Sequence, residues 1–238
     1  MDVTGLRSLC EAFQRTANAH PDAPALRAPG GTPAITWREY AERVRRVAAG
    51  LHALGVRRGD AVGLMLLNRP EFHLVDTGAM HLGAAPFSVY NTSPAGQIAH
   101  VLRNAGARVV ICEANFVDRV RAAGGAVEHI VVIEGALEGT LSLAELEGMS
   151  EGGFDFDGAW RAVQPEDLLT LIYTSGTTGP PKGVELTHAN MIAQIAGLDD
   201  VMTVHVGDRM ASYLPSAHVA DRWISHYVGM IYGLDITS

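Results

Sequence analysis

Between Asp60 and Ile133 the sequence alternates short apolar runs with longer amphipathic stretches. Strands are expected at 61–67, 84–89, 108–112 and 129–133, and helices after Pro70, at about 94–104 and at 114–123. Buried strands separated by helices are typical of βαβ units, in which parallel strands form a sheet covered by helices on both faces. The fold class is therefore predicted to be α/β, with largely parallel sheets flanked by helices.

Before this region the pattern is helical with one interruption. An amphipathic stretch at 6–19 predicts a helix, the segment 20–24 contains two prolines that end it, and short extended pieces follow at 25–28 and 34–36. Thr36 and Glu39 have the spacing of a capping box, so a second helix is expected to begin there. Gly55 is expected to end that helix.

The stretch 134–164 is rich in glycine and acidic residues and predicts a linker that is ordered only in part. We expect one N-terminal domain over residues 1–238 with a looser substructure boundary near 134–164. The order expected beyond it is strand 168–174, a glycine-rich loop, strand 183–186, a helix from about Thr187, strand 210–214 and a final helix.

Composition excludes several classes of protein. The 238 residues are 47% hydrophobic and 18% charged, with a formal net charge of -8, which argues against a nucleic-acid partner because phosphates require clustered Lys and Arg. Cys10 and Cys112 predict free thiols in a reducing compartment rather than a disulfide framework. The N-terminus lacks the basic and apolar segments of a secretory signal, and no apolar run approaches about 18 residues. We therefore expect a cytoplasmic protein, with peripheral membrane contact left open.

The segment that indicates chemistry is YTSGTTGPPKG, residues 173–183, between two apolar runs. Glycines allow backbone N–H groups to approach an anion, Ser and Thr hydroxyls donate or bind magnesium, and Lys182 supplies a positive charge. By composition alone a flexible surface turn is the alternative. The nucleotide triphosphatase loop does not fit, because Lys182 is followed by a strand-like piece and not by a helix.

This segment resembles the signature YTSGTTGxPKG of the adenylate-forming superfamily, which includes acyl-CoA synthetases, luciferases and peptide-synthetase adenylation domains. Residues 186–190 resemble the LTHxN element of these enzymes, and also fit a helix N-cap at Thr187. Residues 214–222 resemble the LPLxHxxER element of acyl-CoA synthetases of long-chain type, with Ser216 in place of leucine and Asp221 in place of glutamate. The order of elements resembles these enzymes over essentially the whole chain.

The resemblance implies the residues of a site. His218 would stabilise charge at the reacting carboxylate. The other histidines, among them His73, His81, His100 and His226, lack metal-site spacing and are interpreted as structural. Trp223 and Tyr227, four residues apart on the last expected helix, are interpreted as core residues in preference to an acyl-pocket lining.

Family members join a carboxylic acid to the α-phosphate of ATP and then pass the acyl group from AMP to CoA. The resemblance implies that a fatty acid, ATP, Mg²⁺ and CoA are the substrates and cofactors, and that Lys182 supports the departing pyrophosphate. The phosphate ligands would be Thr174, Ser175, Gly176, Thr177, Thr178, Gly179 and Lys182. Thr174 would also be a magnesium ligand.

The family's YGxTE and TGD elements, its hinge and its small C-terminal lid domain do not occur in this sequence. We therefore expect an incomplete N-terminal domain of the adenylate-forming synthetase fold. The first interpretation is part of an acid–CoA ligase. The second is a non-catalytic nucleotide- or partner-binding remnant, completed by another polypeptide. In the third, the acid passes to a carrier-protein thiol. Nothing in the sequence identifies the acyl chain length.

Overall fold

The computed structural model describes residues 3, 5–30, 33–124, 127–149, 153–174, 179–198 and 201–238. Its strands are β1 (Pro24–Arg27), β2 (Ile35–Thr36), β3 (Ala61–Met65), β4 (Ala85–Ser88), β5 (Val109–Cys112), β6 (His129–Val132), β7 (Leu141–Ser142), β8 (Leu168–Thr174), β9 (Lys182–Thr187), β10 (Arg209–Ala211) and β11 (Asp235–Thr237). Its helices are α1 (Leu9–Ala19), α2 (Trp37–Ala53), α3 (Pro70–His81), α4 (Ala95–Ala105), α5 (Val117–Ala123), α6 (Leu143–Gly148), α7 (Phe156–Ala162), α8 (His188–Ala196), α9 (Val219–Asp221) and α10 (Val228–Tyr232), with a 3-10 turn η1 (Ala114–Phe116) and a π-helical turn η2 (Arg222–Tyr227).

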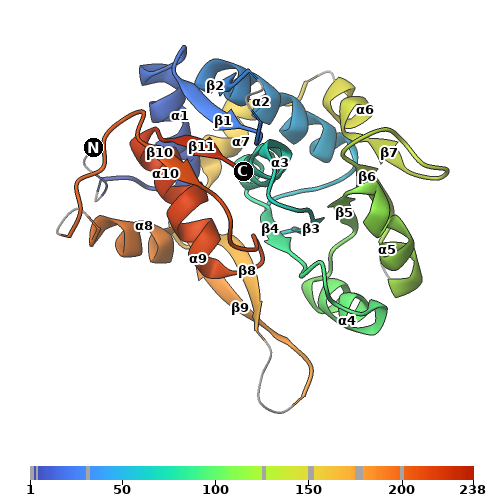
Figure 1. Cartoon of the computed structure of the whole chain (residues 1–238). Coiled ribbons are helices and arrows are strands. Elements are labelled where there is room, and N and C mark those ends of the chain that lie inside the picture. The colour runs from blue at the N-terminus through green and yellow to red at the C-terminus, as the bar shows by residue number, and fades with distance from the viewer. Residues whose placement is uncertain are drawn as a thin grey trace.

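A parallel sheet in the order β4-β3-β5-β6-β7 lies at the centre of the fold. Side chains alternate between its faces, so Val62 and Leu64 of β3 join the core cluster that includes α2 and α3, while Met65 joins the cluster of α4 and α5. Helices therefore cover both faces (Figure 1). The predicted α/β class with largely parallel sheets is confirmed.

The predicted capping box begins α2. The Thr36 side chain accepts a hydrogen bond from the Glu39 backbone N–H, and the Glu39 carboxylate accepts one from the Thr36 N–H at 2.8 Å. At the other end Gly55 has φ +84°, a backbone conformation that residues with a Cβ rarely adopt. Both predicted ends of this helix are confirmed.

A second sheet in the order β10-β11-β1-β2 joins distant parts of the chain. β11 and β1 are its two internal strands, and β11 pairs in parallel with both β1 and β10. The Arg27 guanidinium donates to both Asp235 carboxylate oxygens at 2.8 Å, which fastens β1 to β11. β11 was not predicted from the sequence, because three residues carry too little periodicity to identify a strand.

The expected linker at 134–164 contains structure instead. β7 adds to the edge of the parallel sheet, α6 begins with a capping box between Ser142 and Glu145, and α7 packs its buried Phe156 against the core. The partly ordered linker was therefore wrong for the described part of this segment. Gly135 and Gly139 lie between β6 and β7, whereas Gly148 ends α6 and Gly158 lies within α7. The role of the segment as a substructure boundary stays a prediction.

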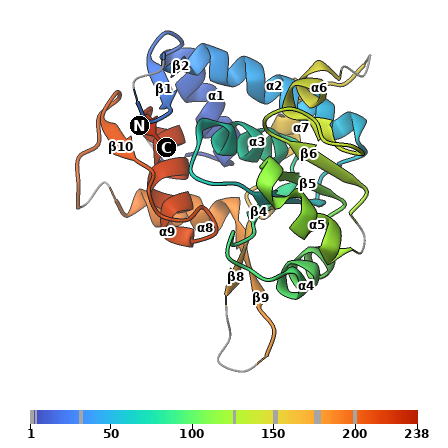
Figure 2. The same ribbon diagram turned by 45° about the vertical axis from the view of Figure 1, so that its right-hand side comes forward.

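β8 and β9 form an antiparallel hairpin that extends away from the rest of the molecule, with α4 close to it (Figures 1 and 2). At its base β8 lies beside β4, where Thr170 donates from Oγ1 to the Pro86 carbonyl at 2.7 Å. The predicted strands on both sides of the glycine-rich loop are confirmed.

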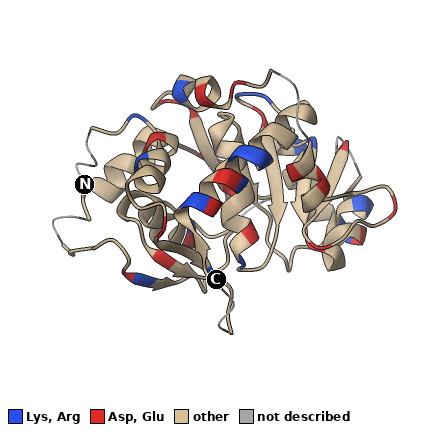
Figure 3. Ribbon diagram, turned by 90° about the horizontal axis from the view of Figure 1, so that it is seen from above, with Lys and Arg blue, Asp and Glu red and all other residues tan. Residues whose placement is uncertain are grey.

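The free thiols predicted from the sequence are confirmed. Cys10 and Cys112 are free and buried, and burial raises the pKa of the Cys112 thiol to about 12. Basic and acidic residues are interspersed on the same helices (Figure 3), as where Arg43 and Arg46 of α2 both contact Glu147. Among the described residues, no helix combines the length and apolar character that a membrane span requires.

Candidate functional site

A cavity of 390 Å³ lies where β4 and β8 end. Ligands of open α/β sheets bind outside the carboxyl ends of the strands, so this position is typical of a binding site. Thr174, at the end of β8, and His218, before α9, both line this cavity. The structure thus brings together two predicted site residues that are far apart in the sequence. The remaining lining comes from Ser88, Val89, Tyr90, Thr92, Ser93, Gln97, Val101, Ile172, Tyr173, Pro181 and Val219.

Several polar residues of this cavity were not predicted from the sequence. Ser88 ends β4, Tyr90, Thr92 and Ser93 follow it, and Gln97 lies in the first turn of α4. The available signal was a run of hydroxyl residues immediately after a predicted buried strand. Because parallel strands present their carboxyl ends at one edge, such a run is a candidate ligand-binding segment.

Lys182 lies in a neighbouring cavity of 490 Å³ between α4 and the hairpin. His100, Asn104 and Glu185 also line this second cavity. Tyr173 and Pro181 line both cavities and so form part of the wall between them. Lys182 is the cross-strand partner of Thr174, which places the two residues at corresponding positions on adjacent strands.

The predicted phosphate ligands Ser175, Gly176, Thr177 and Thr178 lie outside the described residues. Thr174 and Gly179 flank them and are described. Gly179 has φ +105°, so a residue with a Cβ would be strained there. The part that all these residues take in phosphate binding stays a prediction.

His218 is the N-cap residue of α9. Its Nδ1 accepts a hydrogen bond from the Ala220 N–H at 3.1 Å, so the neutral imidazole carries its proton on Nε2. His218 is exposed at the cavity and therefore retains an N–H donor available to a bound anion. Such a donor suits the predicted role of stabilising developing negative charge.

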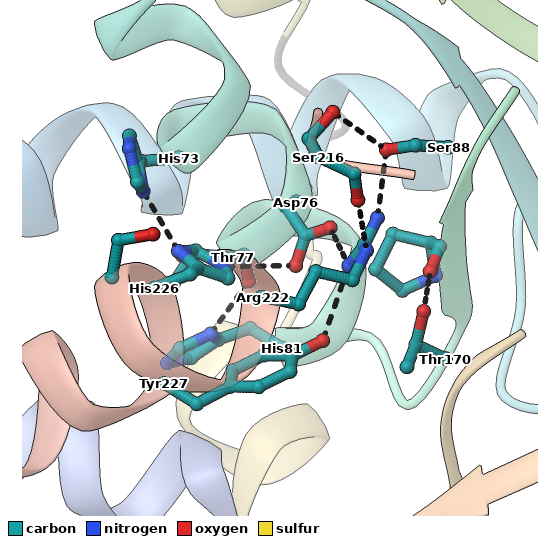
Figure 4. A network of polar contacts seen from close by, with 12 residues as sticks. His73, Asp76, Thr77, His81, Ser88, Thr170, Ser216, Arg222, His226 and Tyr227 are labelled. Atoms are coloured by element: carbon teal, nitrogen blue, oxygen red, sulfur yellow. Dashed lines mark hydrogen bonds and ion pairs between the residues drawn. The ribbon is translucent and has the colours of Figure 1, made fainter. Parts of the chain in front are cut away.

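A buried polar network supports the turn that carries His218. Arg222 is completely buried, and its guanidinium donates to Asp76 at 2.5 Å, to the Ser216 carbonyl at 3.1 Å and to Ser88 Oγ at 3.1 Å (Figure 4). The Ser216 hydroxyl also donates to Ser88 Oγ at 3.1 Å. Ser216 thus adds a polar contact to this network.

The network extends through Asp76 to two histidines of α3 and η2. His226 donates from Nε2 to Asp76 at 2.9 Å, and its Nδ1 lies 2.8 Å from His73 Nδ1. The Val228 N–H donates to the Trp223 carbonyl, which is the i→i+5 pattern of a π-helical turn. The side chains of Arg222, His226 and Tyr227 in this turn are all buried. The structural interpretation of His73 and His226 is therefore confirmed.

Burial and charge act in opposite directions on the pKa of Asp76 and in the same direction on the pKa of His73. Burial alone would raise the pKa of Asp76, but the adjacent charge of Arg222 and the contact with His226 outweigh it, so that pKa is lowered. Burial lowers the pKa of His73 well below its usual value, and the charges of His226 and Arg222 lower it further. The centre is an Asp76–Arg222 ion pair beside a neutral His73.

The LTHxN segment has a structural role. The Thr187 side chain accepts from the Asn190 N–H and begins α8, which is the predicted N-cap. His188 is buried and accepts from the Leu9 N–H at 3.1 Å, so it joins α8 to α1. Tyr227 is likewise completely buried, and its hydroxyl accepts from Arg222, which confirms the core interpretation for Tyr227.

Thr174 offers one hard oxygen atom to a magnesium ion. Among the described residues there is no group of three or more His, Cys, Asp or Glu side chains placed to hold a metal. Mg²⁺ in nucleotide sites is held largely by substrate phosphates and water, with few protein oxygens. The residues present fit an ion brought by a nucleotide and do not fit a site built from protein side chains.

Thr174, which precedes the glycine-rich segment, lines a polar cavity at the carboxyl ends of α/β strands, a position typical of the nucleotide-binding class of α/β domains. Comparison with protein families identifies the group within that class. The chain belongs to the AMP-binding enzyme family, whose match covers residues 13–237.

Individual relatives agree with this assignment. The uncharacterized protein Rv1549 of Mycobacterium tuberculosis is 63% identical over 129 residues, which cover 54% of this chain and 74% of that protein. Fatty acyl-CoA synthetase A of Dictyostelium discoideum is 32% identical over 218 residues, covering 84% of this chain and 33% of that enzyme. The N-terminal domain of FACL13 from Mycobacterium tuberculosis superposes with a TM-score of 0.82 at 26% identity, over 98% of this chain and 57% of that structure. The chain thus spans about a third of the synthetase.

Proposed function

We propose that this chain contributes the ATP-phosphate and carboxylate side of a fatty acid–CoA ligase site. The observation that carries the proposal is the 390 Å³ cavity in which Thr174, next to the glycine-rich loop, lies together with His218. Membership of the AMP-binding enzyme family and likeness to a fatty acyl-CoA synthetase support this choice of reaction.

In the proposed first step a carboxylate oxygen of the fatty acid bonds to the α-phosphorus of ATP. The bond from that phosphorus to the bridging oxygen breaks, and pyrophosphate leaves with the electron pair. Residues 174–179 would hold the β- and γ-phosphates, Lys182 would stabilise the leaving pyrophosphate, and His218 Nε2–H would donate to oxygen at the reacting centre. Thr174 would hold a bound Mg²⁺, which would neutralise phosphate charge.

In the proposed second step the thiolate sulfur of CoA bonds to the acyl carbon, and AMP leaves with its carboxylate-derived oxygen. Because this chain spans a third of its synthetase relative, we propose that both steps require further sequence, in a longer enzyme or from a complementing polypeptide. A cytoplasmic setting, with the enzyme touching membranes only at its surface, suits a fatty acid substrate. A carrier-protein thiol in place of CoA remains the alternative acceptor.

The first test is ATP binding by calorimetry together with acid-dependent exchange of labelled pyrophosphate into ATP. We expect Thr174→Val to weaken ATP binding about tenfold, because it removes a hydroxyl that contacts a charged group, and Thr174→Ser to retain binding. We expect no pyrophosphate exchange by the chain alone. Exchange would contradict the requirement for further sequence and would identify the acid that the chain activates, and the Thr177→Ala/Thr178→Ala double variant should then lose it.

Binding without exchange would support a nucleotide site that requires further sequence. If the wild-type chain neither binds ATP nor exchanges pyrophosphate, the proposed function is wrong. If Thr174→Val binds ATP as tightly as the wild-type chain does, Thr174 is not part of the ATP site.

A further inference from the structure

α4 contacts the β8–β9 hairpin at two points, one on each side of the glycine-rich loop. Before the loop, the Tyr173 hydroxyl donates to Asn104 Oδ1 at 2.8 Å. After the loop, His100 Nε2 lies 2.9 Å from the Pro181 carbonyl, and because a carbonyl only accepts, His100 is the donor. We call His100 and Asn104, with these two bonds, the α4 clamp.

The two clamp residues are four positions apart, so they lie on the same face of α4. Ile98, Val101 and Leu102 of the same helix are buried in the core beside the parallel sheet. The clamp therefore connects a hairpin that extends from the molecule to a helix fixed by the central core. Figures 1 and 2 show α4 near the hairpin in both views.

Gly183 allows the Tyr173 ring to reach the clamp. Tyr173 and Gly183 are cross-strand partners in the hairpin. A Cβ placed on Gly183 would lie 3.2 Å from Tyr173 Cζ and 3.3 Å from its hydroxyl oxygen, closer than ordinary contact. On its other side the ring meets Phe87 of β4, with ring centroids 5.6 Å apart. The glycine at this motif position thus leaves room for a fixed aromatic ring.

The clamped groups separate the two cavities. Tyr173 and Pro181 line both of them, whereas Thr174 lines the first and Lys182 the second. Each of the last two residues directly follows a clamped residue in the sequence. A shift at either clamp bond would therefore move Thr174 or Lys182 relative to the other.

We propose that His100 and Asn104 are positioning residues that fix the two flanks of the glycine-rich loop and so hold Thr174 and Lys182 in register for the phosphates of ATP. The proposal rests on the proposed function for its nucleotide. It assigns these residues a role through Tyr173 and Pro181, not a contact with substrate.

The test compares the wild-type chain with the double variant His100→Leu/Asn104→Ala. Leucine and alanine are better helix formers than histidine and asparagine, so α4 should remain folded. Arg103→Gln, at an exposed position in the same helix, is the matched control. His100→Gln retains an N–H donor and is the conservative rescue.

The first measurement is amide hydrogen exchange of the unliganded protein at Gly179 and at residues 182–184, the positions of this segment that carry an amide hydrogen. We expect faster exchange in the double variant and wild-type rates in Arg103→Gln. The second is the dissociation constant for ATP, which we expect to rise about tenfold in the double variant through loss of two positioning bonds. The single variant His100→Gln should stay close to the wild type in both.

Unchanged hydrogen exchange in the double variant would overturn the clamp. Faster exchange with an unchanged ATP dissociation constant would overturn its positioning role. If the wild-type chain binds no ATP, both the proposed function and the proposed role of the α4 clamp in ATP binding are wrong. Restraint of the hairpin by α4 is then decided by hydrogen exchange alone.

Discussion

At the scale of single residues, the Asp76–Arg222 pair is the most consequential contact, because both side chains are completely buried. Removing one partner of a buried pair leaves an uncompensated charge in the interior. We expect Arg222→Met to lower the free energy of unfolding by about 3–5 kcal/mol, measured by urea denaturation.

The double variant Asp76→Asn/Arg222→Met tests the reason for that loss. Asparagine removes the charge and keeps an oxygen that His226 can donate to, so most of the lost stability should return. A double variant as unstable as Arg222→Met alone would contradict the charge argument and attribute the loss to the contacts that Arg222 makes with Ser88 and Ser216.

Other residues of the site show which of its members could be predicted from the sequence and which could not. Thr174 and His218 were identified through local motifs, and the structure places both at one cavity. Asp76 and His73 were not identified as partners of Arg222 and His226, because their pairing depends on packing between α3 and η2. A buried arginine implies an acidic partner, but the sequence does not say which acid.

At the scale of elements, α2 illustrates how local signals define a helix. Its capping box satisfies backbone donors that the first helical turn leaves free. We expect Thr36→Ala to lower the free energy of unfolding by about 1 kcal/mol in urea denaturation, and Thr36→Ser to stay near the wild type because it keeps the capping oxygen. Equal losses in both variants would show that the hydroxyl cap is not the cause.

Elements with strong local patterns were therefore predictable. The alternation from β3 to β6 and the hairpin strands β8 and β9 follow directly from apolar runs. Short elements were not, as β7, α6 and α7 show, since glycine and acidic residues dominate the local pattern there. Their stability comes from tertiary burial, for example of Leu146 and Phe156, which composition does not reveal.

At the scale of the whole molecule, buried neutral histidines make folding sensitive to acid. Burial lowers the pKa of His81 to about 3 and that of His188 to about 4. Each uses a ring nitrogen as an acceptor, since Leu9 N–H donates to His188 and the Gln14 amide contacts His81. Protonation would therefore break contacts that join separate helices.

The direction in which stability changes with pH follows from proton binding by these two histidines. Below the ordinary histidine pKa of 6.5 the unfolded chain binds protons that the folded chain does not, so stability falls as pH decreases from about 6.5 towards 4. We expect a loss on the order of 2 kcal/mol for each histidine between pH 6.5 and pH 5, measured by urea denaturation at each pH. His188→Asn keeps an acceptor without titrating and should reduce this pH dependence; an unchanged slope would exclude His188 as a source.

The place of β11 between β1 and β10 also has a consequence for the order in which the chain can fold. β1 and β2 leave the ribosome long before β11 is synthesised, and until then the edge of β1 that pairs with β11 has no strand beside it. An unpaired edge attracts strands of other chains, and contacts between such distant segments form slowly. During synthesis the start of this chain therefore presents an open strand edge, although in the finished molecule β1 is an internal strand of the sheet.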